Sequence, residues 1–362
     1  MNGRPTKLAI IGAGAVGTAI AYSALIRGVA RSIALMDVNA AKVAAEVLDL
    51  SHGLEFVPRA DVVGSDDMSV CAGADVVVMT AGAKQKPGQS RLELAEATIG
   101  LTRSILPRVL EVAPDAIYLM VTNPVDVVTR AALEVSGLPP NRVFGSGTVL
   151  DSSRLRFLIA DHCGVAVQSV HAYIVGEHGD TEIALWSSAT IGGVPLTQWT
   201  PLPGRPPMDF AAREAIRDEV VHAAYKIIEG KGATNYAIGL AATRIVEAVL
   251  GDEHRVMPVS TVADGFPGLE DVCLSLPTVI DRGGARNRLE VPLSDEEREG
   301  LLASAETLRR MQGMATGSRV GALARVGHRD RGLDPRLRVG SGACHSTGPI
   351  LASDAGPPAA CR

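Results

Sequence analysis

The sequence predicts an α/β protein: a doubly wound, mainly parallel sheet in the first part of the chain, followed by a mixed α/β domain. Short apolar runs alternate with longer helical patterns between Lys7 and Gly147, as in strand–helix units around a parallel sheet. A glycine-rich turn joins the first apolar run to the first helical pattern. The chain is 46% hydrophobic but only 3% aromatic, a composition typical of helices that pack on a buried aliphatic sheet.

Six short apolar runs in the first 147 residues have the length of buried strands, and four helical patterns lie between them. The expected strands span residues 7–11, 32–36, 61–63, 76–80, 116–121 and 142–144. The expected helices span residues 15–28, 40–50, 91–112 and 125–136. Pro107 lies inside the third helix, and we expect it to bend or interrupt that helix because proline removes a backbone donor.

Longer helices dominate after Gly147. They are expected at residues 150–163, 208–229, 235–250 and 294–311, with β-like runs at 170–175, 256–262 and 271–277. The last helix opens with Ser294 followed by three acidic residues, the pattern of a capping box. We therefore expect a sheet domain over residues 1–147 and a mixed α/β domain over residues 148–315.

Residues 316–362 are rich in Gly, Pro, Ser and Arg and have no apolar periodicity. Such a segment cannot bury enough apolar surface to offset the entropy lost on ordering, so we expect a disordered tail. The alternative is an arginine-rich binding arm.

The formal net charge is −5, and the tail, with seven Arg and three Asp, contributes +4 and leaves −9 elsewhere. This balance gives no general attraction for nucleic acid or an anionic membrane. The five cysteines are odd in number, widely spaced and without a CxxC pair, which favours buried thiols in a reducing, cytoplasmic protein.

Residues 8–26 form a charge-free run of 19 residues, long enough for a signal peptide or a membrane span. The run contains Gly12, Gly14 and Gly17 and divides into a β-like half and a helix-like half. We therefore expect a strand, a turn and a helix, with secretion as the alternative.

The segment Gly12–Gly17 (GAGAVG) follows an expected strand and opens an expected helix, and Asp37 ends the next strand. In this context the first glycine permits a tight turn, the second lets a pyrophosphate approach the helix N-terminus, and the third allows close packing. Asp37 is placed to bind ribose hydroxyls and repel a 2′-phosphate, so a Rossmann domain that binds NAD rather than NADP is expected. The alternative is a glycine-rich turn without a ligand.

The segment Gly82–Arg91 (GAKQKPGQSR) leaves a strand end and enters a helix, at the sheet edge where ligands bind in open α/β folds. Its cations Lys84, Lys86 and Arg91 suggest a flap that closes over a small anion and excludes water. The alternative is a loop of solvated charges.

His178 lies in a glycine-flanked turn after an apolar run. Imidazole is the natural proton donor and acceptor near neutrality, and a buried aspartate can orient it and favour its charged form. A lone histidine in a turn is more often structural, so other motifs must decide between the two interpretations.

Eight separated segments follow one another along the chain in the order found in a known enzyme family: GAGAVG, MDVN, GAKQKPGQSRLEL, TNPVD, GTVLDSSRLR, GEHGDTE, KGATNYAIG and DVCLSLPTVI. Over residues 5–313 they resemble the lactate/malate dehydrogenase family, and within it the L-lactate dehydrogenases of bacteria. The resemblance implies a cytoplasmic NAD-dependent oxidoreductase that interconverts (S)-lactate and pyruvate in fermentation, downstream of glycolysis. Activity on malate or another 2-hydroxy acid, and a non-catalytic dinucleotide-binding protein, remain the alternatives.

The resemblance also implies roles for four residues. His178 is the expected acid/base and Asp151 its orienting partner. Arg91 is expected to polarise the reacting carbonyl, and Arg154 to hold the substrate carboxylate through two parallel hydrogen bonds. No metal is expected.

By the same resemblance, Asn123 and Thr234 line the substrate pocket and Gln85 selects the substrate. Malate dehydrogenases of the family carry Arg where Gln85 stands, and a neutral amide leaves a second carboxylate uncompensated, so pyruvate is favoured. The expected cofactor contacts are Gly12, Gly14, Ala15, Val16, Gly17, Asp37, Thr80, Ala81, Gly82, Val121 and Asn123.

Finally, the resemblance implies a homotetramer and an allosteric effector, fructose 1,6-bisphosphate, bound at a subunit interface by Arg156 and His171. Arg156 lies two residues beyond Arg154 on one expected helix, about 200° around it, so the two face different ways. The alternative is an ordinary interface ion pair and a structural histidine.

Overall fold

The structure is a computed structural model that describes residues 5–83, 91–263 and 265–323. Its central sheet has nine strands in the order β14-β13-β12-β6-β5-β4-β1-β2-β3. The strands β1 to β6 are parallel and run in the doubly wound order, with the switch point between β1 and β4. They are β1 (Lys7–Ile11), β2 (Ser32–Met36), β3 (Asp61–Ser65), β4 (Val76–Met79), β5 (Ile117–Met120) and β6 (Val143–Gly145). The predicted fold class is confirmed.

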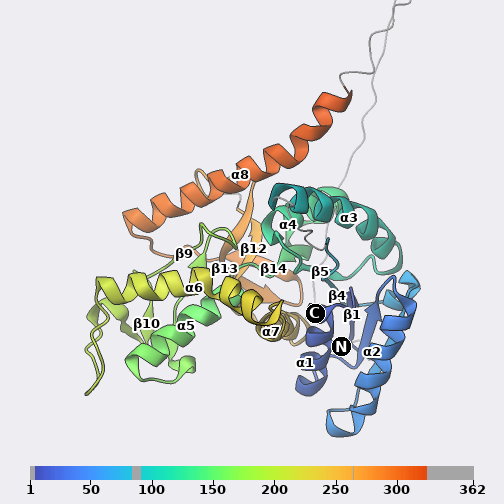
Figure 1. The fold of residues 1–362 in the computed structure, drawn as a ribbon, viewed down its shortest axis with the longest axis horizontal. Helices are drawn as coiled ribbons and strands as arrows, with labels where there is room; N and C mark the ends of the chain where they lie inside the picture. Colours follow the sequence, from blue (N-terminus) through green and yellow to red (C-terminus); the bar gives the residue numbers. More distant parts are fainter. Residues whose placement is uncertain (1–4, 84–90, 264, 324–362) are drawn as a thin grey trace, which may run out of the picture. The chain divides into compact units, whose positions relative to one another are not determined.

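Alternate residues of these strands face two separate layers of helices, as a buried parallel sheet requires. One layer contains α1 (Ala15–Arg27), α2 (Ala40–His52) and α7 (Tyr236–Leu250), and the other contains α3 (Arg91–Val112) and α4 (Val125–Ser136). Figure 1 shows α3 and α4 together on one side of the strands and α1, α2 and α7 on the other. The two layers bury the sheet in aliphatic side chains.

The second half of the chain extends the same sheet with antiparallel strands, which the sequence did not predict. β12 (Arg255–Val262) pairs with β6, β13 (Cys273–Asp281) pairs with β12, and β14 (Gly284–Arg288) closes the edge. Around them lie α5 (Val149–Cys163), α6 (Phe210–Lys231) and α8 (Asp295–Leu323). Two small sheets contain β7 (Val170–His171), β8 (Ile174–Val175), β9 (Ile183–Ala184), β10 (Thr190–Ile191) and β11 (Val194–Pro195). Short 3-10 turns cover 54–56, 68–71, 140–142, 167–169 and 196–198.

Three details differ from the sequence prediction. The apolar run at 170–175 is two strands, β7 and β8, in different sheets, because its two ends pair with different partners. Helix α3 continues through Pro107 without interruption. Helix α8 extends to Leu323, past residue 316 where the tail was expected to begin; residues 316–323 contain no proline that would end a helix. Residues 324–362 lie outside the described part.

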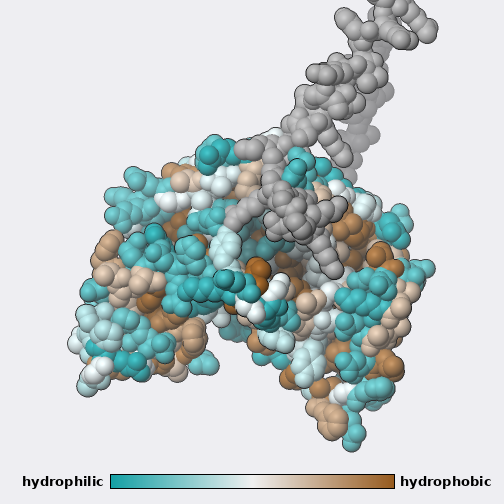
Figure 2. All heavy atoms as spheres, viewed as in Figure 1, coloured by the Kyte–Doolittle hydropathy of each residue, from teal (hydrophilic) through white to brown (hydrophobic). Residues whose placement is uncertain are grey.

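The apolar run at 8–26 forms β1 and α1, as the strand–turn–helix interpretation predicts. Among the described helices, none combines the length and the apolar character needed to cross a membrane. On the face drawn in Figure 2, hydrophobic residues form separate patches among hydrophilic ones, several of them in the region of α1 and α2.

Candidate active site at the carboxyl edge of the sheet

The glycine-rich loop between β1 and α1 needs two of its three glycines for packing. Gly12 has φ +103°, and a Cβ there would lie 2.9 Å from Oγ1 of Thr80. A Cβ on Gly17 would lie 1.9 Å from the carbonyl oxygen of Gly12. A Cβ on Gly14 would meet nothing within 4 Å. The loop therefore leaves open space beside the backbone at the N-terminus of α1, which fits a bound phosphate group.

The carboxylate of Asp37 is fixed beside this loop at the end of β2. The backbone N–H of Ala13 donates to its Oδ2 at 2.8 Å, and the N–H of Asn39 donates to its Oδ1 at 3.0 Å. Each oxygen keeps acceptor capacity, and the residue is partly exposed. This arrangement fits a ligand with neighbouring hydroxyl groups, such as the ribose of NAD.

The ends of β4 and β5 complete the same edge. The hydroxyl of Thr80 donates to the carbonyl oxygens of Ile11 and Gly12, at 2.9 Å each. A Cβ on Gly82 would lie 2.2 Å from Cγ2 of Thr122, so only glycine fits there. The edge also contains partly exposed Val16, Ala81 and exposed Ala15, with Val121 buried and Asn123 exposed just before α4. The predicted cofactor residues thus lie at consecutive strand ends of one sheet edge.

His178, Asp151 and Arg154 are brought together from two segments. Nδ1 of His178 lies 2.5 Å from Oδ2 of Asp151, and Nη1 of Arg154 donates to Oδ1 of the same carboxylate at 2.6 Å. Asp151 and Arg154 lie in the first two turns of α5, three residues apart on one face. The side chain of Asp151 is only 2% exposed, whereas that of His178 is 23% exposed. The imidazole therefore has a buried carboxylate at Nδ1, and none of the described residues hydrogen-bonds to its Nε2, which can face a ligand.

The charges around this pair shift several pKa values. Burial opposes the charged form of His178, but Asp151, with Asp126 and Glu182, outweighs it and raises the pKa of His178 to about 9. Burial of Asp151 is likewise outweighed by His178 and Arg154, which lower the pKa of its carboxyl. Burial, and repulsion from Asp151, raise the pKa of Glu182 to about 9. With a pKa of about 9, the His178 imidazole carries its proton at neutral pH.

Two buried acids near His178 had no role in the sequence analysis. The backbone N–H of His178 donates to Oδ2 of Asp126 at 2.8 Å, and the Ser260 hydroxyl donates to its Oδ1 at 2.6 Å. Glu182 offers a carboxylate oxygen within 4.8 Å of Asp151 and His178. Both acids lie inside quoted motifs, and Asp126 also interrupts an apolar run, which is the signal that could have drawn attention to it.

Acids and an imidazole at this spacing can hold a metal ion, but the contacts here favour proton transfer. The Asp151 carboxylate is already shared between the ring of His178 and the guanidinium of Arg154. The permanent positive charge of Arg154 disfavours a cation at the same carboxylate.

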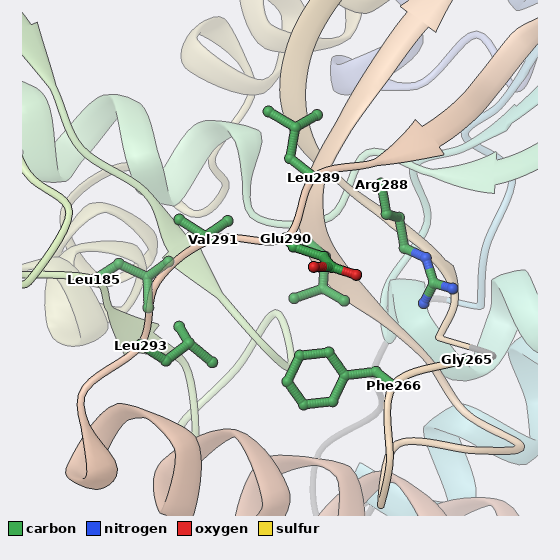
Figure 3. Close-up of a pocket in the computed structure, with 9 residues that line it drawn as sticks. Leu185, Gly265, Phe266, Arg288, Leu289, Glu290, Val291 and Leu293 are labelled. Atoms are coloured by element: carbon green, nitrogen blue, oxygen red, sulfur yellow. The ribbon is translucent and has the colours of Figure 1, made fainter.

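A hollow of about 580 Å³ adjoins this cluster on the side of α6. It is lined by Asp180, Glu182, Arg217, Asp218, Val221, His222 and Tyr225. A smaller pocket of about 130 Å³ lies near β14 and the start of α8. Figure 3 shows the ring of Phe266 facing Leu293 and the carboxylate of Glu290 in it. Neither pocket is lined by a residue that the sequence analysis named, but the larger one includes Glu182, whose carboxylate lies within 4.8 Å of the side chains of Asp151 and His178, so we place the candidate site at His178.

For the other predicted substrate residues, no hydrogen bond to His178 or Arg154 is found among the described side chains. Thr234 lies in the loop between α6 and α7 and is partly exposed; within the described part of the chain, no hydrogen bond joins it to His178 or Arg154. Gln85 lies in the segment 84–90, outside the described residues, as do Lys84 and Lys86. Arg91 is the first residue of α3, and its side chain is also outside the description.

The predicted effector residues are neighbours in the structure. Nε of Arg156 donates to the carbonyl oxygen of Ala172 at 2.8 Å, and its guanidinium lies 5.1 Å from the ring centroid of Tyr173. Burial lowers the pKa of Arg156. His171, the residue before Ala172, is exposed at the end of β7.

Comparison with known proteins identifies two family models. Residues 6–145 match the NAD binding domain of lactate/malate dehydrogenase, and residues 148–315 match its alpha/beta C-terminal domain. An L-lactate dehydrogenase from Bifidobacterium animalis subsp. lactis is 58% identical over 84% of this chain and 96% of its own. Another from Gloeobacter violaceus is 46% identical over 84% of this chain and 91% of its own.

Two solved structures with a similar fold are also lactate dehydrogenases. A lactate dehydrogenase from a deep-sea metagenome library superposes with a TM-score of 0.82 at 35% identity, covering 86% of this chain and 99% of that chain. The minor L-lactate dehydrogenase of Enterococcus mundtii, in a ligand-bound form, gives a TM-score of 0.81 at 39% identity, covering 85% and 97%.

The doubly wound sheet, the glycine loop with Asp37 and the histidine–aspartate pair define an NAD-dependent oxidoreductase. The chain belongs to the lactate/malate dehydrogenase family.

Proposed function

We propose that the protein is an NAD-dependent L-lactate dehydrogenase that interconverts (S)-lactate and pyruvate. The observation that carries the proposal is the contact between His178 and Asp151, with Arg154 on the same carboxylate. It supplies a proton donor and a carboxylate-binding cation at one point, as a small 2-oxo acid requires. The 58% identity to an L-lactate dehydrogenase supports the choice of substrate.

In the proposed mechanism, Arg154 binds the substrate carboxylate while His178 hydrogen-bonds to the carbonyl oxygen at C2. Nε and Nη2 of Arg154 make no hydrogen bond with the described residues, which leaves two donors for the substrate. NADH, held at the glycine loop and Asp37, would supply the hydride for C2. Protonated His178 gives its proton to the carbonyl oxygen. Asp151 stabilises the imidazolium before transfer and keeps the ring oriented. In lactate oxidation, neutral His178 accepts the proton.

Arg91, at the start of α3, is assigned to polarising the same carbonyl, and Asn123 and Thr234 to lining the pocket. Residues 1–147 form the cofactor-binding domain and also contribute Arg91 and Asn123 to the substrate pocket, whereas residues 148–315 form the catalytic domain with His178, Asp151 and Arg154. The matches of the two family models to residues 6–145 and 148–315 support this division.

Two glycine variants separate cofactor binding from folding. Gly14→Ala is expected to keep the melting temperature but weaken NADH binding, because its methyl group fills only the open space beside the loop. Gly17→Ala is expected to lower both the melting temperature and the affinity for NADH, because its methyl group collides with the Gly12 carbonyl oxygen. Thermal melts and NADH fluorescence titration measure the two effects. Unchanged NADH affinity in Gly14→Ala contradicts the cofactor assignment.

The substrate test compares pyruvate with oxaloacetate. A neutral side chain at Gln85 favours the monocarboxylate, so NADH consumption is expected with pyruvate at a much higher kcat/KM than with oxaloacetate. Preference for oxaloacetate supports the malate alternative, and no NADH consumption with either supports a non-catalytic binding protein.

A homotetramer is also part of the proposal. A largely apolar hollow of about 540 Å³ is formed by α1, α2 and α7. Tyr22, Ile26, Tyr236 and Leu240 line it, and each is more than half exposed. Exposed apolar patches of this kind are typical of subunit interfaces. A cytoplasmic location is supported by the buried thiols of Cys71 and Cys163, neither of which forms a disulfide with a described residue.

Fructose 1,6-bisphosphate is the proposed effector, bound through Arg156 and His171 across a subunit interface. Millimolar bisphosphate is expected to lower the KM for pyruvate and promote tetramers, because it binds one state preferentially. The double variant Arg156→Gln, His171→Gln is expected to lose this response and keep its turnover at saturating pyruvate. Steady-state kinetics and sedimentation measure both effects. Identical KM and sedimentation of the wild type with and without bisphosphate contradict the proposal.

A further inference from the structure

The carboxylate of Asp126 connects three parts of the molecule that meet at the candidate site. It lies in the first turn of α4, is 2% exposed, and comes three residues after Asn123. One oxygen accepts the backbone N–H of His178 at 2.8 Å, and the other accepts the hydroxyl of Ser260 at 2.6 Å. Ser260 lies in β12, opposite Gly145 of β6. A single buried group thus ties the His178 loop to helix α4 and to the extension of the sheet.

We propose that Asp126 is a positioning residue for His178, holding the backbone of the His178 loop in register with Asn123 and β12. Ring orientation is already provided by Asp151, which contacts Nδ1, so Asp126 acts on a different part of the same residue. Without the hydrogen bond from the His178 N–H to Asp126, the backbone of His178 loses its hydrogen bond to helix α4. A small displacement of a proton donor lowers the reaction rate by a large factor. The kinetic part of this inference rests on the proposed lactate dehydrogenase activity.

The charge of Asp126 provides a second readout. Among the described side chains, the titratable and charged groups around His178 are Asp151 and Arg154 on α5, Asp126 on α4, and Glu177 and Glu182 on its own loop. Burial raises the pKa of Asp126 to about 6, against hydrogen bonds from Ser260 and His178, so the carboxylate is mainly charged at neutral pH. In that state it adds to the attraction that keeps the proton on His178.

Two variants separate charge from hydrogen bonding. Asp126→Asn can still accept the N–H of His178 and donate to a turned Ser260 hydroxyl, but it has no charge. Ser260→Ala keeps the charge and the bond to His178 but frees one side of the carboxylate. The matched control is Thr129→Val, on the same helix, because the buried Thr129 hydroxyl has no hydrogen-bond partner among the described residues.

The experiment measures the pKa of His178 by NMR titration of ring carbons, assigned by the signal that His178→Asn removes, together with kcat and KM for pyruvate. Asp126→Asn is expected to lower the His178 pKa by about one pH unit and keep most of kcat at neutral pH. Ser260→Ala is expected to lower kcat about three- to tenfold with KM and the His178 pKa little changed. Thr129→Val is expected to match the wild type in all three.

If Asp126→Asn leaves the His178 pKa unchanged and Ser260→Ala leaves kcat unchanged, the inference is wrong. If the wild type does not reduce pyruvate, the proposed function fails, and the NMR titration still decides whether Asp126 acts on His178. Equal losses of kcat in Thr129→Val and Ser260→Ala indicate a general packing effect and overturn the positioning role.

Discussion

Replacing His178 with asparagine is expected to lower kcat for pyruvate reduction by about 10²- to 10⁴-fold while NADH affinity stays within about twofold. The asparagine amide can occupy the position of Nδ1 and still donate to Asp151, so the buried carboxylate keeps its partner. The variant then lacks only the second nitrogen, which carries the proton to the substrate. Stopped-flow measurement of NADH consumption gives the rate, and fluorescence titration gives the affinity.

The control for this variant is His52→Asn, at the exposed C-terminal end of α2. It is expected to retain the wild-type kcat. A His178→Asn enzyme with more than about a tenth of the wild-type kcat would exclude His178 as the general acid.

Replacing Gln85 with arginine is expected to reverse the choice of substrate. A new guanidinium pairs with the second carboxylate of oxaloacetate and repays its desolvation, whereas pyruvate leaves that charge unpaired in the closed site. The ratio of kcat/KM for pyruvate to that for oxaloacetate is expected to fall. The fall corresponds to a change of about 2 to 5 kcal/mol in the free energy by which the transition states of the two substrates are discriminated. Initial rates over a range of both substrates measure the ratio.

Gln85→Met is the matched control, because it keeps the length of the side chain and adds no charge. It is expected to preserve the preference for pyruvate. An unchanged ratio in Gln85→Arg means that another part of the site selects the substrate.

The local elements of the fold were predictable because their signals lie within a few residues. The strands at 7–11 and 32–36 and the helices at 91–112 and 125–136 begin and end where apolar periodicity and turn residues indicate. The extension of the sheet was not predictable in this way. It depends on pairing between Ser260 and Gly145, which lie far apart in the chain and carry no local mark of that contact.

The candidate site divides in the same way. The glycine loop and Asp37 lie in one strand–helix–strand unit, so spacing alone brought them together. The association of His178 with Asp151 came from family resemblance, and the structure gives the geometry of the contact. Asp126 was missed because its partners are a backbone N–H and the hydroxyl of Ser260, neither of which has a sequence signature.

The most direct test of the central claim is the pH dependence of kcat/KM for pyruvate in the wild type and in Asp151→Asn. Pyruvate reduction needs the proton on His178, so its rate is lost as pH rises through the His178 pKa. The wild type is expected to be level through neutral pH and to fall above about pH 9. Asp151→Asn removes the main group that favours the imidazolium, so its decline is expected to begin about two pH units lower. The same alkaline decline in both enzymes would contradict the claim that Asp151 holds His178 in its proton-donating form.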